Sequence, residues 1–179
     1  LLLVLNPQIS LSPRLAISHP ITESSKLYFN YGHYQQMPVA QDLYRVRRGF
    51  SEEVLTIGDP SLPMANTIAY EIGYDQSFFD SYLIHLSAYY KDISDQQDYT
   101  TFISANSKVN YSKLTANSYE DIRGFEFEFS KVRGKWLTGF TNFEYRVNTS
   151  GYYGLGRYYE NPSDQRNYEL NNEKQSKPR

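Results

Sequence analysis

Acidic side chains recur two residues apart in this sequence, an arrangement from which a pair of catalytic carboxylates could be built. Glu126 and Glu128 flank one phenylalanine, and Glu71 occupies the equivalent face of another alternating segment. Two carboxylates on either side of a sugar could act as the acid and base of a glycosidase. However, an i, i+2 spacing on one strand separates them by about 6.5–7 Å through strand rise alone, and no substrate cleft is indicated. We therefore favour a hydrated wall and expect no enzymatic activity.

Two polar segments could instead bind a ligand. The first, YRVRRGF, clusters Arg45, Arg47 and Arg48, whose guanidinium groups could hold an anionic ligand or the phosphates of lipopolysaccharide. The alternative is a solvated loop in which these arginines pair with neighbouring glutamates. The second, SGYYGLGRYYE, presents Tyr152 and Tyr153, whose rings could stack on a sugar or chelate ring. Its glycines do not match G-x-G-x-x-G, so a nucleotide site is not indicated.

Metal and cofactor chemistry is not indicated by the remaining residues. The chain has three His and no Cys, and none of the histidines has a second ligand at metal-binding spacing. The formal net charge of -2 does not mark the chain as a nucleic-acid binder. We therefore expect no metal site, no cofactor and no nucleic-acid partner.

The segments that position these residues alternate apolar and polar side chains with a period of two, which is typical of β-strands. Six strands are predicted: 9–19, 26–34, 67–75, 83–91, 123–131 and 136–146. Seven large apolar residues of two such segments are expected on one face: Ile68, Tyr70, Ile72, Tyr74, Phe125, Phe127 and Phe129. Four acidic residues are expected on the opposite face: Glu71, Asp75, Glu126 and Glu128.

The connections between the predicted strands are alternately short and long. Long polar stretches, predicted as loops, follow the second, fourth and sixth strands: 35–66, 92–122 and 147–179. In an up-and-down antiparallel sheet, all the short turns then share one rim and all the long loops share the other. Loops of this length are unusual in a compact soluble domain but normal in outer-membrane barrels. The pattern predicts an all-β, antiparallel, up-and-down transmembrane β-barrel, whose apolar face meets lipid and whose acids line the lumen.

The predicted strands are too few for a closed barrel. Every backbone N–H and C=O group within lipid must be paired, so a membrane-spanning sheet has to close on itself. Six strands are fewer than the eight of the smallest common barrels. We therefore expect the chain to be an arc of a larger barrel, with membrane lipid as a partner.

Five motifs, taken in order, resemble the barrel of TonB-dependent outer-membrane receptors, especially those of Bacteroidetes-like bacteria. They are LSPRLAISHPIT, YFNYGHYQQMP, GDPSLPMANTIAYEIGYDQSF, LSAYYKDISD and RGFEFEFSK. The resemblance implies a 22-stranded barrel in the bacterial outer membrane, with a plug domain that is not recognisable in this chain. It further implies a receptor that binds a scarce metal chelate, cobalamin or glycan at the cell surface. Import would be powered by the TonB complex, acting through the missing plug region.

Two other classes of protein fit the same alternation. A soluble β-sandwich that binds a glycan would bury its apolar faces against each other and carry its site on the long loops. An outer-membrane barrel enzyme would need a constellation of Ser, His and an acid, and no histidine here lies convincingly near such a set. We rank the sandwich second and the enzyme last.

Overall fold

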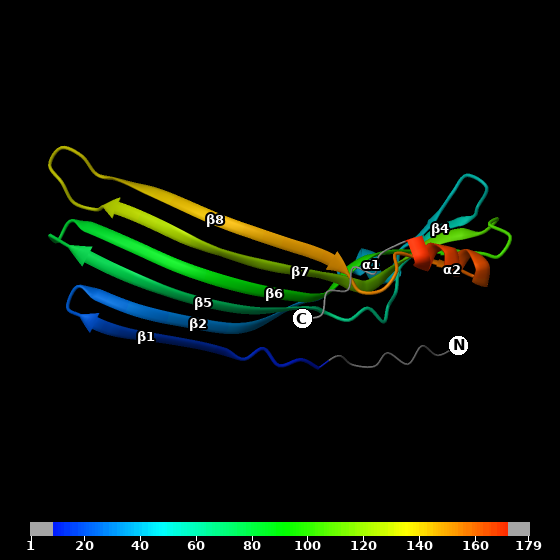
Figure 1. Ribbon diagram of the computed structural model, residues 1–179, viewed down its shortest axis with the longest axis horizontal. Helices are drawn as coiled ribbons and strands as arrows, with labels where there is room; N and C mark the ends of the chain where they lie inside the picture. Colours follow the sequence, from blue (N-terminus) through cyan, green and yellow to red (C-terminus); the bar gives the residue numbers. More distant parts are fainter. Residues whose placement is uncertain (1–8, 172–179) are drawn as a thin grey trace.

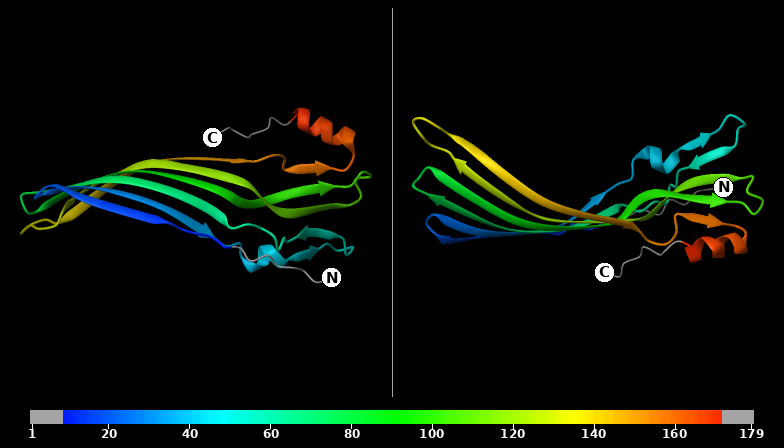
Figure 2. Two further views of the ribbon diagram at one scale, coloured as in Figure 1. Left: turned by 90° about the horizontal axis from the view of Figure 1, so that it is seen from below. Right: turned by 45° about the horizontal axis from the view of Figure 1, so that its top comes forward.

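The computed structural model describes residues 9–171, which form one long antiparallel sheet (Figure 1). Six strands make up its body: β1 (Arg14–Thr22), β2 (Ser25–Gln36), β5 (Ala65–Phe78), β6 (Tyr82–Ile103), β7 (Asn110–Lys131) and β8 (Gly139–Tyr152). Each of them pairs in antiparallel orientation with the next. The predicted all-β, up-and-down arrangement is confirmed, and the sheet is curled rather than flat (Figure 2).

Short turns lie at one end of the sheet and long connections at the other (Figure 1). Glu23 and Ser24 join β1 to β2, residues 79–81 join β5 to β6, and residues 132–138 join β7 to β8. Two successive residues of the second turn, Phe79 and Asp80, have a φ of 51°. Consecutive left-handed residues of this kind form type I′ hairpin turns, whose twist matches that of the flanking strands.

The prediction that residues 92–122 form a loop is wrong. β6 and β7 continue through this region and pair with each other as far as Ile103 and Asn110. Many of the added pairs are polar, such as Thr101 opposite Ser112. Other pairs are apolar, such as Phe102 opposite Tyr111. Both faces of the extension mix polar and apolar side chains, so the period-two signal is lost although the backbone ladder continues.

The other two predicted loops also contain regular structure. The range 35–66 holds α1 (Ala40–Tyr44), β3 (Val46–Arg48) and β4 (Val54–Ile57). The range 147–179 holds the end of β8, then β9 (Arg157–Tyr159) and α2 (Pro162–Asn171), and its last eight positions lie outside the described residues. Neither helix is long and apolar enough to cross a membrane within the described part of the chain.

The first and last long strands differ in extent from the prediction. β1 begins at Arg14 and continues through Pro20 to Thr22, and β8 occupies 139–152 rather than 136–146. Pro20 lies at a register shift in β1, the outermost strand of this sheet. Proline lacks an N–H donor, and outer strands and bulges are the places where a sheet tolerates it.

Short strands join the long connections to the body of the sheet. β4 pairs in parallel with β7 at Thr56 and Ile57, and β3 pairs with β4. On the other side, β9 pairs in parallel with β6. Lys113 on β7 also forms an ion pair with Asp59, which follows β4, at 2.7 Å. Three segments far apart in the sequence are therefore held in one sheet at the long-connection end.

The strand register separates the two kinds of side chain. One row across the six strands consists of Ile17, Phe29, Ile72, Ala88, Phe125 and Tyr145. The next row, on the opposite face, consists of Ser18, Tyr28, Gly73, Ser87, Glu126 and Glu144. We call these the apolar face and the polar face.

No second layer covers the apolar face. Ile17, Ile72 and Phe125 on it are 53%, 48% and 47% exposed. Within the described residues, the buried hydrophobic side chains are only Leu62, Leu114 and Tyr119. A β-sandwich requires two sheets packed face to face, so this single-layered chain does not support the sandwich alternative.

The Asp59–Lys113 ion pair predicts that the attachment of β4 depends on pH. Burial raises the pKa of the Asp59 carboxyl, but hydrogen bonds from Lys113 and Ser61 and the charge of Lys113 outweigh it and hold that pKa below its usual range. Such a carboxyl stabilises the fold above about pH 4 and loses this contribution as the pH falls through its lowered pKa. A nitroxide on the Leu55→Cys variant, whose cysteine would be unique in the chain, should become more mobile during acidification.

The pair is partly exposed, so its expected contribution is at most about 1 kcal/mol. In the Asp59→Asn variant the nitroxide should already be mobile at neutral pH, and acidification should not increase its mobility further. Asp42→Asn, a change in the neighbouring helix α1, should keep the acid-induced increase. If acidification still increased the nitroxide mobility in Asp59→Asn, the increase would come from the titration of another group.

Candidate functional site

Hydrogen-bonded side chains occupy the middle of the polar face. The Tyr28 hydroxyl donates to Glu71 Oε1 at 2.9 Å and lies 3.4 Å from His85 Nε2. Asn30 Nδ2 donates to Glu71 Oε2 at 3.4 Å. The Tyr28 and His85 rings are stacked, with centroids 5.9 Å apart. Both oxygens of the Glu71 carboxylate therefore have donors supplied by β2.

A second group on the same face surrounds Asp75. Lys26 Nζ lies 3.0 Å from Asp75 Oδ2, and His85 Nδ1 lies 2.5 Å from Asp75 Oδ1. Lys26 and His85 are the cross-strand neighbours of Asp75 on β2 and β6. Directly opposed residues on one face are close enough to interact, so the register alone brings these three together.

The other two predicted lumen acids lack such partners. Glu126 and Glu128 share the polar face with Glu71 and Asp75. Over residues 9–171, neither of them takes part in a side-chain hydrogen bond or ion pair. The nearby Glu144 accepts a hydrogen bond from the Tyr89 hydroxyl at 2.6 Å. The polar face is thus neutralised around Asp75 but carries unpaired acids on β7.

Tyrosine rings lie against glycines on the neighbouring strand. A methyl group built on Gly73 would lie 2.2 Å from Tyr28 Cζ, and one built on Gly124 would lie 2.7 Å from the Tyr89 hydroxyl. Each tyrosine is directly opposite its glycine in the register. Any side chain at these glycines would displace the ring, which explains glycine within a strand. These pairs were not predicted from the sequence, although a glycine inside an alternating segment was an available signal.

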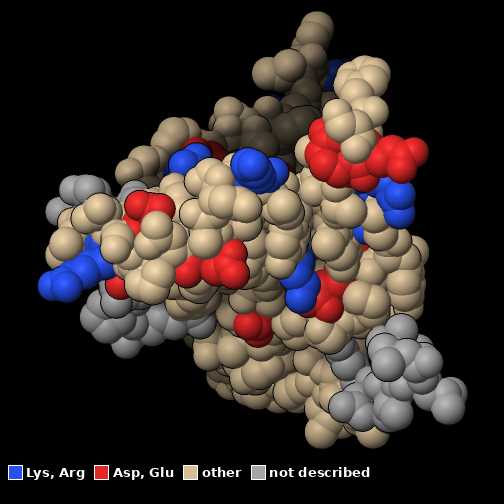
Figure 3. Space-filling view, turned by 90° about the vertical axis from the view of Figure 1, so that its right-hand side faces the viewer, with Lys and Arg blue, Asp and Glu red and all other residues tan. Residues whose placement is uncertain are grey.

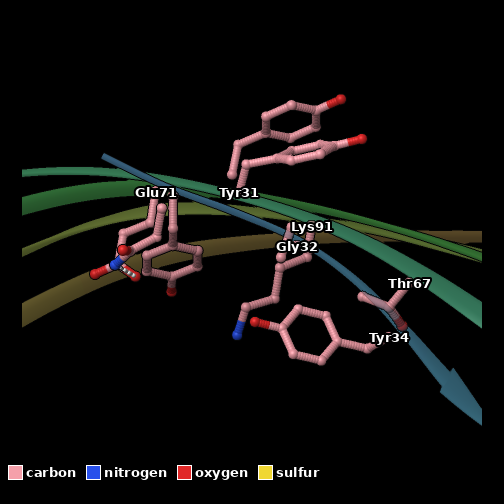
Figure 4. A pocket seen from close by; sticks show the side chains of 10 residues that line it. Tyr31, Gly32, Tyr34, Thr67, Glu71 and Lys91 are labelled. Carbon is pink, nitrogen blue, oxygen red and sulfur yellow. Dashed lines mark hydrogen bonds between the residues drawn. The ribbon is translucent and has the colours of Figure 1, made fainter. Parts of the chain in front are cut away.

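A hollow of about 400 Å³ opens on the polar face (Figure 4). Gly32 and Ala69, cross-strand neighbours on β2 and β5, are among the residues that line it, and the ring of Tyr34 lies over the buried Gly32. Larger polar and aromatic side chains surround them: Asn30, Tyr34, Thr67, Glu71, Tyr89 and Lys91. The ring of Tyr31, at the edge of the hollow, points to the opposite side of the sheet from Glu71 and Tyr34 (Figure 4). The hollow therefore lies beside the Tyr34 ring, over the small side chain of Ala69.

The residues predicted to bind ligand lie on separate elements. Arg45 follows α1, Arg47 and Arg48 belong to β3, Tyr152 ends β8 and Tyr153 follows it. The predicted pairing of these arginines with glutamates is absent, since none of the three forms an ion pair within residues 9–171. The Tyr153 ring contacts Tyr119 at a centroid distance of 4.9 Å. Acidic and basic side chains lie next to one another at this end of the molecule (Figure 3).

The residues predicted to face lipid all lie on the apolar face. Rings cluster at two levels of that face. The loop-side aromatic band consists of Tyr31, Tyr70 and Tyr90, with centroids 5.2 and 6.4 Å apart. The turn-side aromatic band consists of Phe78, Tyr82 and Phe129, with centroids 5.3 and 5.8 Å apart between neighbours. Aliphatic and aromatic residues lie between the bands, among them Ile72, Leu86 and Phe127.

Comparison with known proteins gives one family and several solved structures of similar fold. Residues 9–176 match the family model described as TonB dependent receptor-like, beta-barrel. The hemophore receptor HasR of Serratia marcescens, solved as a double mutant with its hemophore HasA and heme, is 16% identical with a TM-score of 0.62. The outer membrane transporter YddB of Escherichia coli gives 14% and 0.63, and the FrpB iron transporter of Neisseria meningitidis gives 14% and 0.54.

These alignments cover 76%, 78% and 78% of this chain and 22%, 20% and 19% of HasR, YddB and FrpB. The chain thus spans about a fifth of the length of the solved structures that it matches. At these identities the likeness concerns the fold alone. The search of curated proteins gave no match.

The Tyr28–Gly73 pair predicts a coupled effect of two substitutions. Gly73→Ala should lower the free energy of unfolding by about 1–3 kcal/mol, because the new methyl group overlaps the Tyr28 ring. In a Tyr28→Ser background the same change should cost little, since the ring is gone. Urea unfolding of the four variants of this cycle measures the coupling. Gly139→Ala is the control, because nothing lies within 4 Å of its added methyl group. If Gly73→Ala lowered the free energy of unfolding equally in both backgrounds, the contact between Tyr28 and Gly73 would be contradicted.

Proposed function

This chain belongs to the TonB-dependent receptor β-barrel family of the bacterial outer membrane, and we propose that it forms an arc of the barrel wall of a transporter. The observation that carries the proposal is the single-layered sheet with one uncovered apolar face. An apolar surface this continuous is unusual on a protein surrounded by water. In a barrel, lipid covers this face and the polar face lines the lumen.

The two aromatic bands support this orientation. Aromatic residues gather at both membrane–water interfaces of outer-membrane barrels, on either side of an apolar zone. The bands here lie on the apolar face, on either side of such a zone. We propose that the seven predicted residues of this face contact lipid and that the four acids of the polar face line the lumen. The chain would be one part of a larger barrel.

We further propose that the long connections face the outside of the cell and bind a scarce substrate for import. Short turns on the periplasmic side and long loops outside are usual in these barrels. HasR was solved with heme, and OprC and FrpB are named as copper and iron transporters, which makes a metal chelate the first class to test. Cobalamin and glycans are the other candidate classes. Five residues of these connections are proposed to contact the ligand: Arg45, Arg47, Arg48, Tyr152 and Tyr153.

A growth experiment tests the proposed function. A strain lacking the complete receptor should grow poorly when its substrate is limiting, in one of three media limited for chelated metal, cobalamin or a glycan. Re-expressed receptor should restore growth, and a protonophore should stop uptake of the labelled substrate, because import is powered through TonB. Equal growth of mutant and parent in all three media would contradict a transport role.

Lysine substitutions on the two faces of the sheet are expected to lower the free energy of unfolding by unequal amounts. Phe127 shares a row with Tyr74, which is midway along β5 between Tyr70 and Phe78 of the two bands. Phe127→Lys should therefore place a charge near the centre of the bilayer and lower the free energy of unfolding by about 2–4 kcal/mol. Tyr70→Lys places the charge at the loop-side aromatic band, where a charge facing lipid should lower the free energy of unfolding by only about 0–1 kcal/mol.

Glu126→Lys is the matched control for Phe127→Lys. It places the same side chain one residue away on the polar face, where Glu126 has no ion-pair partner among the described residues. We expect it to change the stability by less than about 1 kcal/mol. Denaturant unfolding in lipid vesicles measures all three variants. A cost that is equal on the two faces would contradict the proposed orientation.

A further inference from the structure

We propose that three stacked rings near the tip of the β6–β7 hairpin form a subsite for an uncharged sugar ring. The rings are those of Tyr111 on β7, Phe102 on β6 and Tyr158 on β9, and we call them the ring row. The inference rests on the proposed import function, because it requires the long connections to meet a substrate outside the cell. It deepens that function by choosing a glycan among the three candidate classes.

The strand register puts the three rings side by side. Phe102 lies directly opposite Tyr111 on one side and pairs with Tyr158 on the other. The centroid of the Phe102 ring is 5.3 Å from that of Tyr111 and 5.6 Å from that of Tyr158, with interplanar angles of 17° and 15°. Nearly parallel rings at these distances are offset from one another, so each leaves part of its face uncovered. The ring row thus offers aromatic surface built from two separate long connections, 92–122 and 147–179.

A second, smaller hollow opens beside the ring row, and all three rings line it. Its volume of about 290 Å³ is at the lower limit of small-molecule pockets, which is about 300 Å³. The hollow therefore suits one ring of a longer ligand rather than a whole ligand. The Tyr158 side chain is 43% exposed, so a ligand can reach the ring row without displacing it.

Polar groups that also line this hollow are held in place by backbone donors. Glu160 Oε2 accepts a hydrogen bond from the Ala105 N–H at 2.8 Å, and Ser104 Oγ accepts one from the Val109 N–H at 3.0 Å. Over residues 9–171, Glu160 Oε1 accepts no hydrogen bond. A fixed carboxylate oxygen is therefore left available to a ligand.

Aromatic surface beside a free acceptor matches both parts of a sugar. The face of an aromatic ring carries partial negative charge, which attracts the C–H groups on the flat side of a sugar ring. The sugar hydroxyls lose water on binding and need new partners, and a carboxylate is a strong acceptor. The hydroxyls of Tyr111 and Tyr158, unbonded within the described part of the chain, supply donors that a cationic ligand would have no use for.

The charges around this hollow disfavour an anionic ligand. Among the described residues, Glu160 is the charged side chain that lines it. Three cations of this region do not line it. Arg157 lies in the neighbouring cross-strand row, on the opposite face of β9, Lys113 is paired with Asp59 at 2.7 Å, and Lys108 belongs to the turn between β6 and β7. Because like charges brought together oppose binding, an acidic sugar or an anionic chelate is a poorer match than a neutral sugar.

Saturation-transfer NMR on the complete receptor tests the proposal, in micelles of a detergent that has no sugar headgroup. The probes are the neutral oligosaccharides cellohexaose, maltohexaose and mannohexaose, with hexagalacturonate as their acidic counterpart. We expect at least one neutral probe to receive saturation through its ring C–H protons and to bind at least about tenfold more tightly than hexagalacturonate. Tyr158→Ala should weaken that binding by about fivefold or more, because it removes the exposed end of the ring row.

Two further variants separate a binding role from a packing role. Tyr99→Ala is the matched control, because Tyr99 is 45% exposed and lies on the same strand as Phe102 but on its opposite face. It should leave binding unchanged. Glu160→Gln keeps an oxygen for the Ala105 N–H but removes the negative charge. It should narrow the difference between the neutral probe and hexagalacturonate to about threefold or less. A ring row that only stabilises the hairpin would bind none of the probes.

Failure of all three neutral probes to bind would overturn the proposal, as would equal weakening by Tyr99→Ala and Tyr158→Ala. Tighter binding of choline or of a ferric tris-catecholate, lost in Tyr158→Ala, would also overturn it and assign the ring row to a cation or a chelate. Substrate-limited growth keeps the two proposals separate. A receptor that imports chelated metal or cobalamin but binds no oligosaccharide contradicts only the sugar subsite, whereas one that supports no import contradicts the transport proposal.

Discussion

The structure depends on one constraint: a single-layered sheet has no core against which to bury its apolar side chains. Hydrogen bonds between neighbouring strands satisfy the backbone from β1 to β8, but only three hydrophobic side chains are buried among the described residues. Burial of apolar area is the main favourable term in folding. The apolar face must therefore be covered by something outside the chain, and the register keeps the charged residues of the central strands off that face between the two aromatic bands.

The faces of the sheet could be predicted from the sequence because each depends only on local alternation. Glu71 lies between Tyr70 and Ile72 in sequence, and no long-range information is needed to place them on opposite sides. The extension of β6 and β7 could not be predicted in the same way. Thr101 and Ser112 meet there through the backbone ladder, next to Phe102 and Tyr111, and a strand pair whose two faces both mix polar and apolar residues has no periodic signal.

The sequence predicted that these residues form a polar wall, but it did not predict which of their side chains are in contact. Glu71 and Asp75 were expected on the polar face, and they lie there. The Tyr28 hydroxyl that bonds to Glu71 is 43 residues away in sequence, and only the strand register brings the two together. The hollow is lined by residues of β2, β5 and β6, which only the strand register brings together. The arginines and tyrosines proposed to contact a ligand were predicted from loop composition, which does not show which residues lie side by side.

The short strands at the long-connection end change the thermodynamics of whatever binds there. β4 on β7, β9 on β6 and the Asp59–Lys113 pair fix three separate segments to one backbone ladder. Their conformational entropy is lost when the chain folds rather than when a ligand arrives. Ordering of flexible segments is a major cost of association, so preorganised connections allow high affinity from few contacts. Such a surface selects ligands by shape, because segments fixed in this way do not rearrange to fit a ligand of a different shape.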